Sequence, residues 1–460
     1  MATAIECPNC KRLQAEVDGL KARISALEEE LRRGRRQAAP FGRDRAEGAG
    51  KKPGRKPGQG EFARRESPPP EQTETLHVPL DRCPHCGGPI EDRKTHENFE
   101  TDLPIPLPRH RRYLTESGWC PRCRRRVRSR HPEQSVFALG AAAVGVGPNL
   151  KAIAADLHHR LGVPYAKVAD HLAAKSGVTL TPSALCQSDR RLADKLRPVY
   201  AELVAAIRQC CAVHADETGW RIGTLSAWLW VFTSKTITVY VIDKSRGHEV
   251  VVEILGREFR GVLVGDCFLA YDHRAFAEWI HQKCFAHFLK DLSRLEQEKT
   301  RGAVRFPREA AAILRDALAL RNEKPKLSSR AFAHRLNALE RRIDAAIAQT
   351  RRFSDPDNRR FAKRLRKHRA HLFTFLRIDG VEPTNNRAER MLRPAVVVRK
   401  TGACNKTQAG AETHSILSSV LATAKQRAVN GIAYLASVLT APAAGSGPTA
   451  VPSLLAVNTS

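Results

Sequence analysis

The chain has 460 residues, and its 77 lysines and arginines against 48 aspartates and glutamates give a net charge of +29. So large a positive excess is typical of proteins that bind a polyanion such as nucleic acid. No apolar run of about 20 residues and no secretory leader occurs, which argues against a membrane or exported protein. We therefore expect the 12 cysteines to lie in a reducing cytoplasm.

Apolar residues recur every three or four positions within residues 1–34. They are Leu13, Val17, Leu20, Ile24, Leu27 and Leu31. This is the a/d pattern of a coiled coil of about three heptads, so we predict a zipper helix and a homo-oligomer. A helix this short, weakened by Gly19, is also consistent with a single amphipathic helix that packs on its own chain.

Residues 35–75 are rich in arginine, glycine and proline and poor in large apolar side chains, which predicts a disordered basic linker. Within it, the segment KKPGRKPG at 51–58 is similar to an AT-hook, whose basic residues Arg55 and Lys56 would enter a narrow minor groove. A flexible cationic linker without that role is an equal alternative.

Two Cys-x-x-Cys pairs lie within residues 76–133, where we predict a zinc-ribbon-like DNA-binding module. The four predicted ligands are Cys83, Cys86, Cys120 and Cys123, a set suited to tetrahedral structural Zn²⁺. Arg124, Arg125 and Arg126 follow the second pair and are predicted to contact the DNA backbone. The separate pair Cys7 and Cys10 could be a redox pair, a metal site between subunits, or without function.

Residues 134–205 have a helical pattern, with turns at 162–164 and 176–178 and with Thr181 or Ser183 as the cap of the next helix. The segment resembles a helix-turn-helix. Its recognition helix would present Gln187, Ser188, Arg190 and Arg191 to a DNA groove. A helical linker that packs on the core is the alternative.

Residues 206–291 are predicted to form the first part of a mixed α/β core. A short apolar run from Cys210 ends at Asp216, and segments 227–232 and 236–242 read as the two arms of a hairpin. A linker with a short helix follows at 244–255. The apolar run 261–264 then predicts a strand that ends at Asp266, and 276–295 reads as a helix.

A third acid, Glu389, lies in the segment TNNRAER at 384–390, at a predicted helix start within the C-terminal helices 383–440. Three convergent carboxylates need a cation between them, and two Mg²⁺ or Mn²⁺ ions would both satisfy the charges and support phosphoryl transfer. Each acid alone could be a turn or cap residue. Glu217 remains an alternative ligand for the first position.

The segment between the second and third acids, 292–382, has helix-periodic apolar residues and many basic ones, so we predict an inserted basic helical subdomain that contacts phosphates. Its densest basic run comprises Arg359, Arg360, Lys363, Arg364, Arg366, Lys367 and Arg369. The last segment, 441–460, is rich in alanine, proline and serine and reads as a disordered tail.

Four motifs in order resemble those of insertion-sequence-66 family transposases: HADETGW, GVLVGDCFLAYD, QKCFAHFLKDL and PTNNRAERMLRP. The resemblance implies an RNase H-like core of the DDE type, with Asp216, Asp266 and Glu389 as catalytic residues. It also aligns Cys284 and His287 with a Cys-x-x-His element of the family. The segment Gly265-Asp266-Cys267 departs from the family, which more often has a Ser-Asp pair there.

The resemblance predicts a bacterial, nucleoid-associated DNA transposase that binds the ends of its element, nicks a strand and joins it to target DNA. Asn385, Asn386, Arg387, Arg390 and Arg393 flank the third acid and would position phosphate or organise the helix, while His287 would assist proton transfer or substrate positioning. Helper proteins of the same element are plausible partners. A catalytically inert, zinc-dependent DNA-binding protein and a non-specific RNase H-like nuclease are the alternatives.

Overall fold

The structure is a computed structural model that divides the chain into two units, 1–104 and 105–460. The residues that it describes are 16–25, 28, 69–73, 75–76, 82, 88–89, 91, 108–129, 131, 134, 145–348, 353–402, 404–440 and 451–456. Several predictions fall outside these residues: the zipper positions Leu13, Leu27 and Leu31, the pair Cys7 and Cys10, Arg55, Lys56, Cys83 and Cys86. Within the described part, no helix is both long and apolar enough to cross a membrane.

In the first unit, residues 16–25 form a helix, and a short 3-10 turn, η1, spans Pro70–Gln72. Three of the predicted zipper side chains lie in that helix. Val17, Leu20 and Ile24 are 42, 61 and 56% exposed. Their spacing of three and four places them on one face of the helix, which leaves an apolar stripe open to solvent.

A small hairpin precedes the helices of the second unit. Strands β1 (Ser117–Cys120) and β2 (Arg125–Arg128) pair antiparallel, with Cys120 opposite Arg125. The turn between them contains Cys123 and ends at Arg124, whose φ of 50° places it in the left-handed region. The second predicted Cys-x-x-Cys pair therefore lies at the tip of a hairpin.

Three helices follow: α2 (Pro148–His159), α3 (Tyr165–Ser176) and α4 (Pro182–Ile207). The turns predicted at 162–164 and 176–178 are present, with Gly162 and Gly177 at φ of 75° and 67°. Of the two predicted caps, Thr181 is the one that accepts a hydrogen bond from the backbone of Ala184, at 3.2 Å.

The centre of the second unit is a five-stranded mixed sheet in the order β5-β4-β3-β6-β7. Its strands are β3 (Ala212–Ile222), β4 (Leu225–Thr233), β5 (Thr238–Asp243), β6 (Val262–Gly265) and β7 (Ile280–Lys283). The first three strands pair antiparallel, whereas β6 and β7 run parallel to β3. The mixed α/β class predicted from the sequence is confirmed, as is the hairpin of β4 and β5.

Two local predictions were wrong. Asp216 is not at the end of its strand, because β3 continues to Ile222 and pairs with β4 along that extension. The predicted helix 276–295 is instead strand β7 followed by helix α6 (Phe285–Glu298). Three of the four residues of β7 are polar and yet buried, and Gln282 among them is 0% exposed.

Helices cover both faces of the sheet. The face that bears Val213 packs on α4 and on α5 (His248–Leu255), the short helix predicted within 244–255. The other face packs on α11 (Asn386–Gly402), with Trp220 and Leu229 against Leu392. Hydrophobic side chains enclosed on both faces form the core that holds the strand ends in place.

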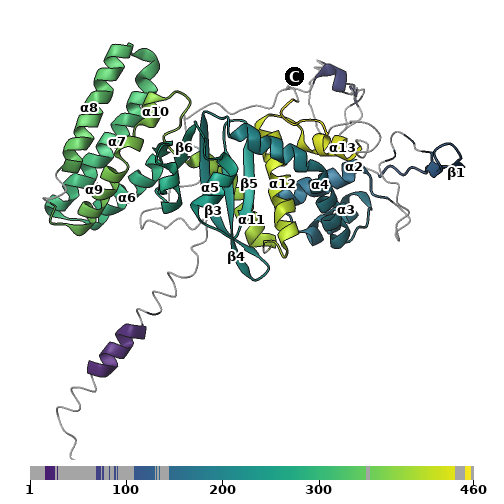
Figure 1. The fold of residues 1–460 in the computed structure, drawn as a ribbon, viewed down its shortest axis with the longest axis horizontal. Coiled ribbons are helices and arrows are strands. Elements are labelled where there is room, and N and C mark those ends of the chain that lie inside the picture. The colour runs from purple at the N-terminus through teal and green to yellow at the C-terminus, as the bar shows by residue number, and fades with distance from the viewer. Residues whose placement is uncertain are drawn as a thin grey trace, which may run out of the picture. The chain divides into compact units, whose positions relative to one another are not determined.

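Helix α12 (Gln408–Gln426) lies along the outer strand of the sheet, where Figure 1 shows it in yellow beside β5. Ser419 Oγ accepts from the Tyr240 amide at 2.8 Å, and Thr423 Oγ1 accepts from the Thr238 amide at 3.0 Å. The hydroxyls of one helix face thus satisfy backbone groups that another strand would otherwise bond, which closes this edge.

The basic segment between the second and third acids is helical, as predicted. It contains α7 (Arg305–Glu323), α8 (Ser329–Ala348), α9 (Pro356–Lys367) and α10 (Thr374–Arg377), drawn in green in Figure 1. Their apolar faces form one buried cluster that also includes Phe285 and Phe288 of α6. These helices therefore pack mainly on one another and on α6.

The end of the chain corrects one further prediction. Residues 451–456, within the segment 441–460 that we predicted to be disordered, pack on the core beside α13 (Gly431–Thr440). Leu454 is 0% exposed, and the hydroxyl of Tyr434 donates to the carbonyl of Pro452 at 2.8 Å. A buried leucine in an alanine- and proline-rich stretch is enough to anchor this part of the tail.

Candidate functional site

Asp216 and Asp266 both lie just beyond the end of the pairing between the parallel strands β3 and β6. The pairing of β3 with β6 matches Ala212 with Val262 and ends with His214 opposite Val264. Two positions further along each chain are the two aspartates, so the same register would place them opposite each other. The sheet therefore brings the first two predicted acids together at one end of the β3–β6 pairing, although Asp216 lies within a longer strand.

Burial and negative charge act together on Asp216. Its pKa is raised from an ordinary 3.8 to about 8, first because the carboxyl is buried and then because Glu217, Asp266 and Glu389 are close. The backbone amide of Glu217 donates to Asp216 Oδ1 at 2.9 Å and opposes the shift. A carboxyl with neighbours of the same charge and little water favours a proton or a cation.

Glu217, the alternative first ligand, is already engaged. The hydroxyl of Tyr271 donates to its Oε2 at 2.9 Å, and Arg246 pairs with its Oε1 at 2.9 Å. The Arg246 guanidinium lies over the rings of Trp228 and Phe268, at 4.2 Å from each centroid. Because successive strand residues point to opposite faces, Glu217 lies on the face away from Asp216.

Glu389 lies in the first turn of α11, as predicted, and its amide donates to the carbonyl of Asn385 at 3.2 Å. The buried Asn385 anchors this helix start in two directions. Its side-chain amide donates to the carbonyl of Ala215 on β3 at 2.9 Å, and its backbone amide donates to Cys284 Sγ at 3.1 Å. These bonds fix Glu389 next to the strand that carries Asp216.

Glu389 forms a compact group of possible metal ligands with Cys284 and His287. One ligand atom each from Cys284, His287 and Glu389 lie within 4.8 Å of one another, and His287 Nδ1 is 4.0 Å from Glu389 Oε1. Asp216, Asp266 and Glu389 do not form such a group in the described chain. Asp266 and Glu389 are thus close enough to raise the pKa of Asp216, but the carboxylate oxygens of the three acids do not converge on one metal position.

The surroundings of His287 favour its protonated form. Its pKa is raised to about 9, mainly because of its hydrogen bond with Cys284, and the charges of Asp266 and Glu389 add to the effect. The protonated ring places one positive charge beside two of the acids, and 46% of its side chain is exposed.

A buried lysine that the sequence did not single out supports Asp266. Lys283 at the end of β7 is 1% exposed, donates to the carbonyl of Asp266 at 3.3 Å and pairs with Asp272 at 2.7 Å. Asp272 also pairs with Lys367 of α9 at 2.6 Å, while Asp266 Oδ1 accepts from the Phe268 amide at 2.8 Å. The helical segment is therefore linked by charge to the loop of the second acid.

Some of the predicted basic side chains are exposed and others are paired within the chain. On α11, Arg390 and Arg393 are exposed with Asn386, whereas Arg387 is paired with Glu382. On α9, Arg359, Arg360 and Lys363 are exposed. Arg364 and Arg369 are instead paired with Asp291 and Asp344. Arg360 is also paired with Asp357, at 3.5 Å, and Lys367 with Asp272, so intramolecular ion pairs engage much of the predicted basic run.

The other predicted DNA contacts are open to solvent. Arg124, Arg125 and Arg126 of the hairpin are exposed, as are Arg190, Arg191 and Gln187 of α4. The pKa of Cys120 is lowered, chiefly because the backbone amide of Cys123 donates to it. A turn amide directed at the first sulfur is the geometry of a zinc knuckle, which suits the predicted ligand pair.

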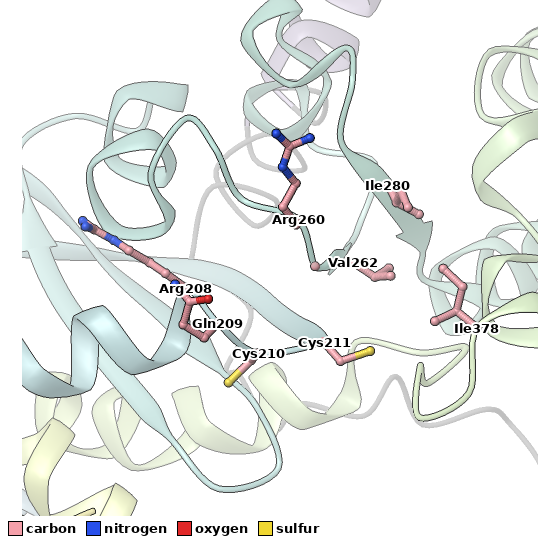
Figure 2. Close-up of a pocket in the computed structure, with 9 residues that line it drawn as sticks. Arg208, Gln209, Cys210, Cys211, Arg260, Val262, Ile280 and Ile378 are labelled. Carbon is pink, nitrogen blue, oxygen red and sulfur yellow. The ribbon is translucent and has the colours of Figure 1, made fainter.

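One pocket of the second unit is not lined by any of the three acids. It is lined at the amino ends of β3 and β6 by Arg208, Gln209, Cys210, Cys211, Arg260, Gly261, Val262, Ile280 and Ile378 (Figure 2). Asp266 follows the carboxyl end of β6, and Asp216 lies in β3 beyond the end of its pairing with β6. The pocket therefore lies at the amino ends of β3 and β6, and the two aspartates lie further along both strands.

Comparison with known proteins agrees with the resemblance in the motifs. A family model described as "Transposase IS66 family" matches residues 144–413, which is more than half of the chain. An uncharacterized protein of Sinorhizobium fredii, y4qI, is 24% identical over 305 residues, which cover 59% of this chain and 55% of that protein. The chain thus spans about half the length of the curated relative that it matches.

Proposed function

We propose that this chain binds the ends of a mobile element and catalyses metal-dependent DNA cleavage and strand transfer. The premise is that the chain belongs to the IS66 transposase family. The observation that carries the proposal is the shared register of Asp216 and Asp266, with Glu389 close enough to raise the pKa of Asp216. Like-charged groups gathered at a sheet edge are costly unless a cation joins them. This supports an RNase H-like core of the DDE type.

The donor chemistry fits hard divalent cations, because the three side chains supply only carboxylate oxygens. Two Mg²⁺ or Mn²⁺ ions held by Asp216, Asp266 and Glu389 would stabilise the attacking and leaving oxygens of an in-line displacement at phosphorus. The raised pKa of Asp216 supports this assignment, since the carboxylate gains most from a cation where water is scarce.

The other residues of the site would orient DNA. Asn385 holds the start of α11 against β3, and Lys283 holds the loop of Asp266, so both fix the acids before substrate arrives. The imidazolium of His287 and the exposed Arg390 would face the phosphate charge, and Cys284 orients His287.

DNA outside the site would follow the exposed basic residues. We assign phosphate contacts to Arg359, Arg360 and Lys363 of the helical insertion, and contacts with the element ends to Arg190 and Arg191 of the helix-turn-helix-like region. The proposed zinc ribbon would add Arg124, Arg125 and Arg126, and the linker Arg55 and Lys56. These assignments predict binding that weakens steeply with salt.

The exposed stripe of Val17, Leu20 and Ile24 supports a zipper between two copies of the chain. Bringing two element ends together requires at least two binding modules, so a homo-oligomer suits the proposed reaction. Helper proteins of the same element and association with the nucleoid are part of this proposal.

The test is cleavage and joining of labelled element-end DNA by the full chain with Mg²⁺ or Mn²⁺. Asp216→Asn, Asp266→Asn and Glu389→Gln are each expected to lower the rate by roughly 100-fold or more while end binding persists. Glu309→Gln, an exposed acid on α7, is the matched control and is expected to retain activity.

The alternatives are separate outcomes of the same experiment. Metal-independent binding without product, even with helper proteins present, would refute catalysis in favour of an inert DNA-binding protein. Equal cutting of end and scrambled DNA would indicate a non-specific nuclease instead.

A further inference from the structure

Cys284, His287 and Glu389 combine three kinds of ligand atom beside the proposed catalytic acids. A sulfur, a ring nitrogen and a carboxylate oxygen lie within 4.8 Å of one another. This donor set differs from that of the proposed Mg²⁺ site, because thiolate and imidazole are preferred by Zn²⁺ and similar ions over Mg²⁺.

Two helix starts build this group. Cys284 directly precedes α6, and His287 follows three residues later on the first turn, so both side chains lie on one face of the helix. Glu389 comes from the first turn of α11. The starts are joined by hydrogen bonds from the Phe285 amide to the carbonyl of Pro383, at 2.9 Å, and from the Asn385 amide to Cys284 Sγ.

The spacing needs little change to bind an ion. Bonds of about 2.0–2.3 Å to a tetrahedral Zn²⁺ place its ligand atoms roughly 3.3–3.7 Å apart. His287 Nδ1 and Glu389 Oε1 are now 4.0 Å apart, and their side chains are 46 and 39% exposed. Cys284 is fully buried and fixed. Small rotations of the two half-exposed side chains toward the sulfur would therefore complete three ligand positions and leave a fourth open, with the protons of the Cys284 thiol and the His287 ring released to solvent as the metal binds.

We propose that Cys284, His287 and Glu389 form a Zn²⁺ site that competes with the catalytic metals for Glu389. A Glu389 carboxylate bound with Cys284 and His287 is drawn away from Asp216 and Asp266, so Zn²⁺ inhibits cleavage. The inhibitory half of this inference rests on the proposed function, whereas the binding half depends only on the three side chains.

Metal binding is measured first, without DNA. The full chain is titrated with Zn²⁺ against a chromophoric chelator, and the equivalents bound are counted. Wild type is expected to bind one equivalent of Zn²⁺ more than the variants Cys284→Ser and His287→Asn. His287→Asn changes a half-exposed side chain and leaves the buried sulfur of Cys284 in place. Cys211→Ser, at an exposed cysteine in the pocket of Figure 2, should match wild type. Equal stoichiometry in all four proteins would overturn the site.

Inhibition is measured second, as the ratio of Mg²⁺-supported cleavage with and without micromolar Zn²⁺ in each protein. Zn²⁺ is expected to lower the cleavage rate of wild type at least tenfold. It is expected to change the cleavage rate of His287→Asn little. An equal loss in both proteins would overturn competition at Glu389. If no protein cleaves DNA while the stoichiometry differs as expected, the proposed function fails and the Zn²⁺ site stands.

Discussion

Asp216→Asn should stabilise the metal-free protein at alkaline pH while removing its activity. The pKa of Asp216 is raised from 3.8 to about 8, mostly by burial. At 1.36 kcal/mol for each tenfold change in proton affinity, this corresponds to roughly 6 kcal/mol as an upper limit on the cost of the buried charge. Water entry and relaxation reduce such costs, so we expect a gain of about 2 kcal/mol, or ~4–8 °C in Tm.

The sign of the pH dependence follows from the raised pKa. Below 3.8 the carboxyl is protonated in both the folded and unfolded chains, and wild type and Asp216→Asn should be equally stable. As pH rises toward about 8 the unfolded chain ionises first, so wild type loses stability that the asparagine variant keeps.

The assay is thermal unfolding in a chelator at pH 5, 7 and 9, repeated with Mg²⁺. The control is Asp170→Asn, an exposed aspartate on α3, which should follow wild type at each pH. Mg²⁺ should raise the Tm of wild type and not that of Asp216→Asn. A variant that is no more stable than wild type at pH 9 would refute the electrostatic account of this site.

Three further substitutions test the parts that hold the site. Lys283→Met removes the buried partner of Asp272 and the donor to Asp266, and should cost about 3 kcal/mol, measured by urea unfolding. Leu454→Ala should cost about 2–4 kcal/mol and make the C-terminus more sensitive to protease, because Leu454 is fully buried. In Gly261→Ala the new Cβ would lie 2.3 Å from the carbonyl of Cys210, so Tm should fall, whereas Gly302→Ala, with nothing within 4 Å, should leave it unchanged.

The sequence was sufficient for elements whose residues carry a local signal. The apolar and β-branched runs that became β4, β5 and β6 predict strands because they pack on a pleated surface, and Thr181 caps α4 through its own side chain. Asp266 follows its strand directly, so its position at the sheet edge could be inferred from the run before it.

Strand β7 was missed because His281, Gln282 and Lys283 are polar and nevertheless buried. Gln282 is 0% exposed only because its side-chain amide donates to the carbonyls of Lys283 and Leu372 and its carbonyl accepts from Phe375. Leu372 and Phe375 are 90 and 93 positions away in the chain, so no local pattern predicts these two partners. For the same reason no local pattern indicated that Lys283 supports Asp266.

The position of Glu389 is the part of the site that spacing along the chain could least predict. Asn385 and Cys284 are 101 positions apart, yet the hydrogen bond between them joins the starts of α6 and α11. The helical segment from α6 to α10 therefore begins and ends at nearly one point, and Glu389 is held by bonds to β3 and to the start of α6 rather than by helices α7–α10. Changes of length within the insertion should thus leave the third acid in place, so its distance from Asp266 in sequence says little about its distance in space. What fixes Glu389 is the pair of helix starts, and the same pair brings it to Cys284 and His287.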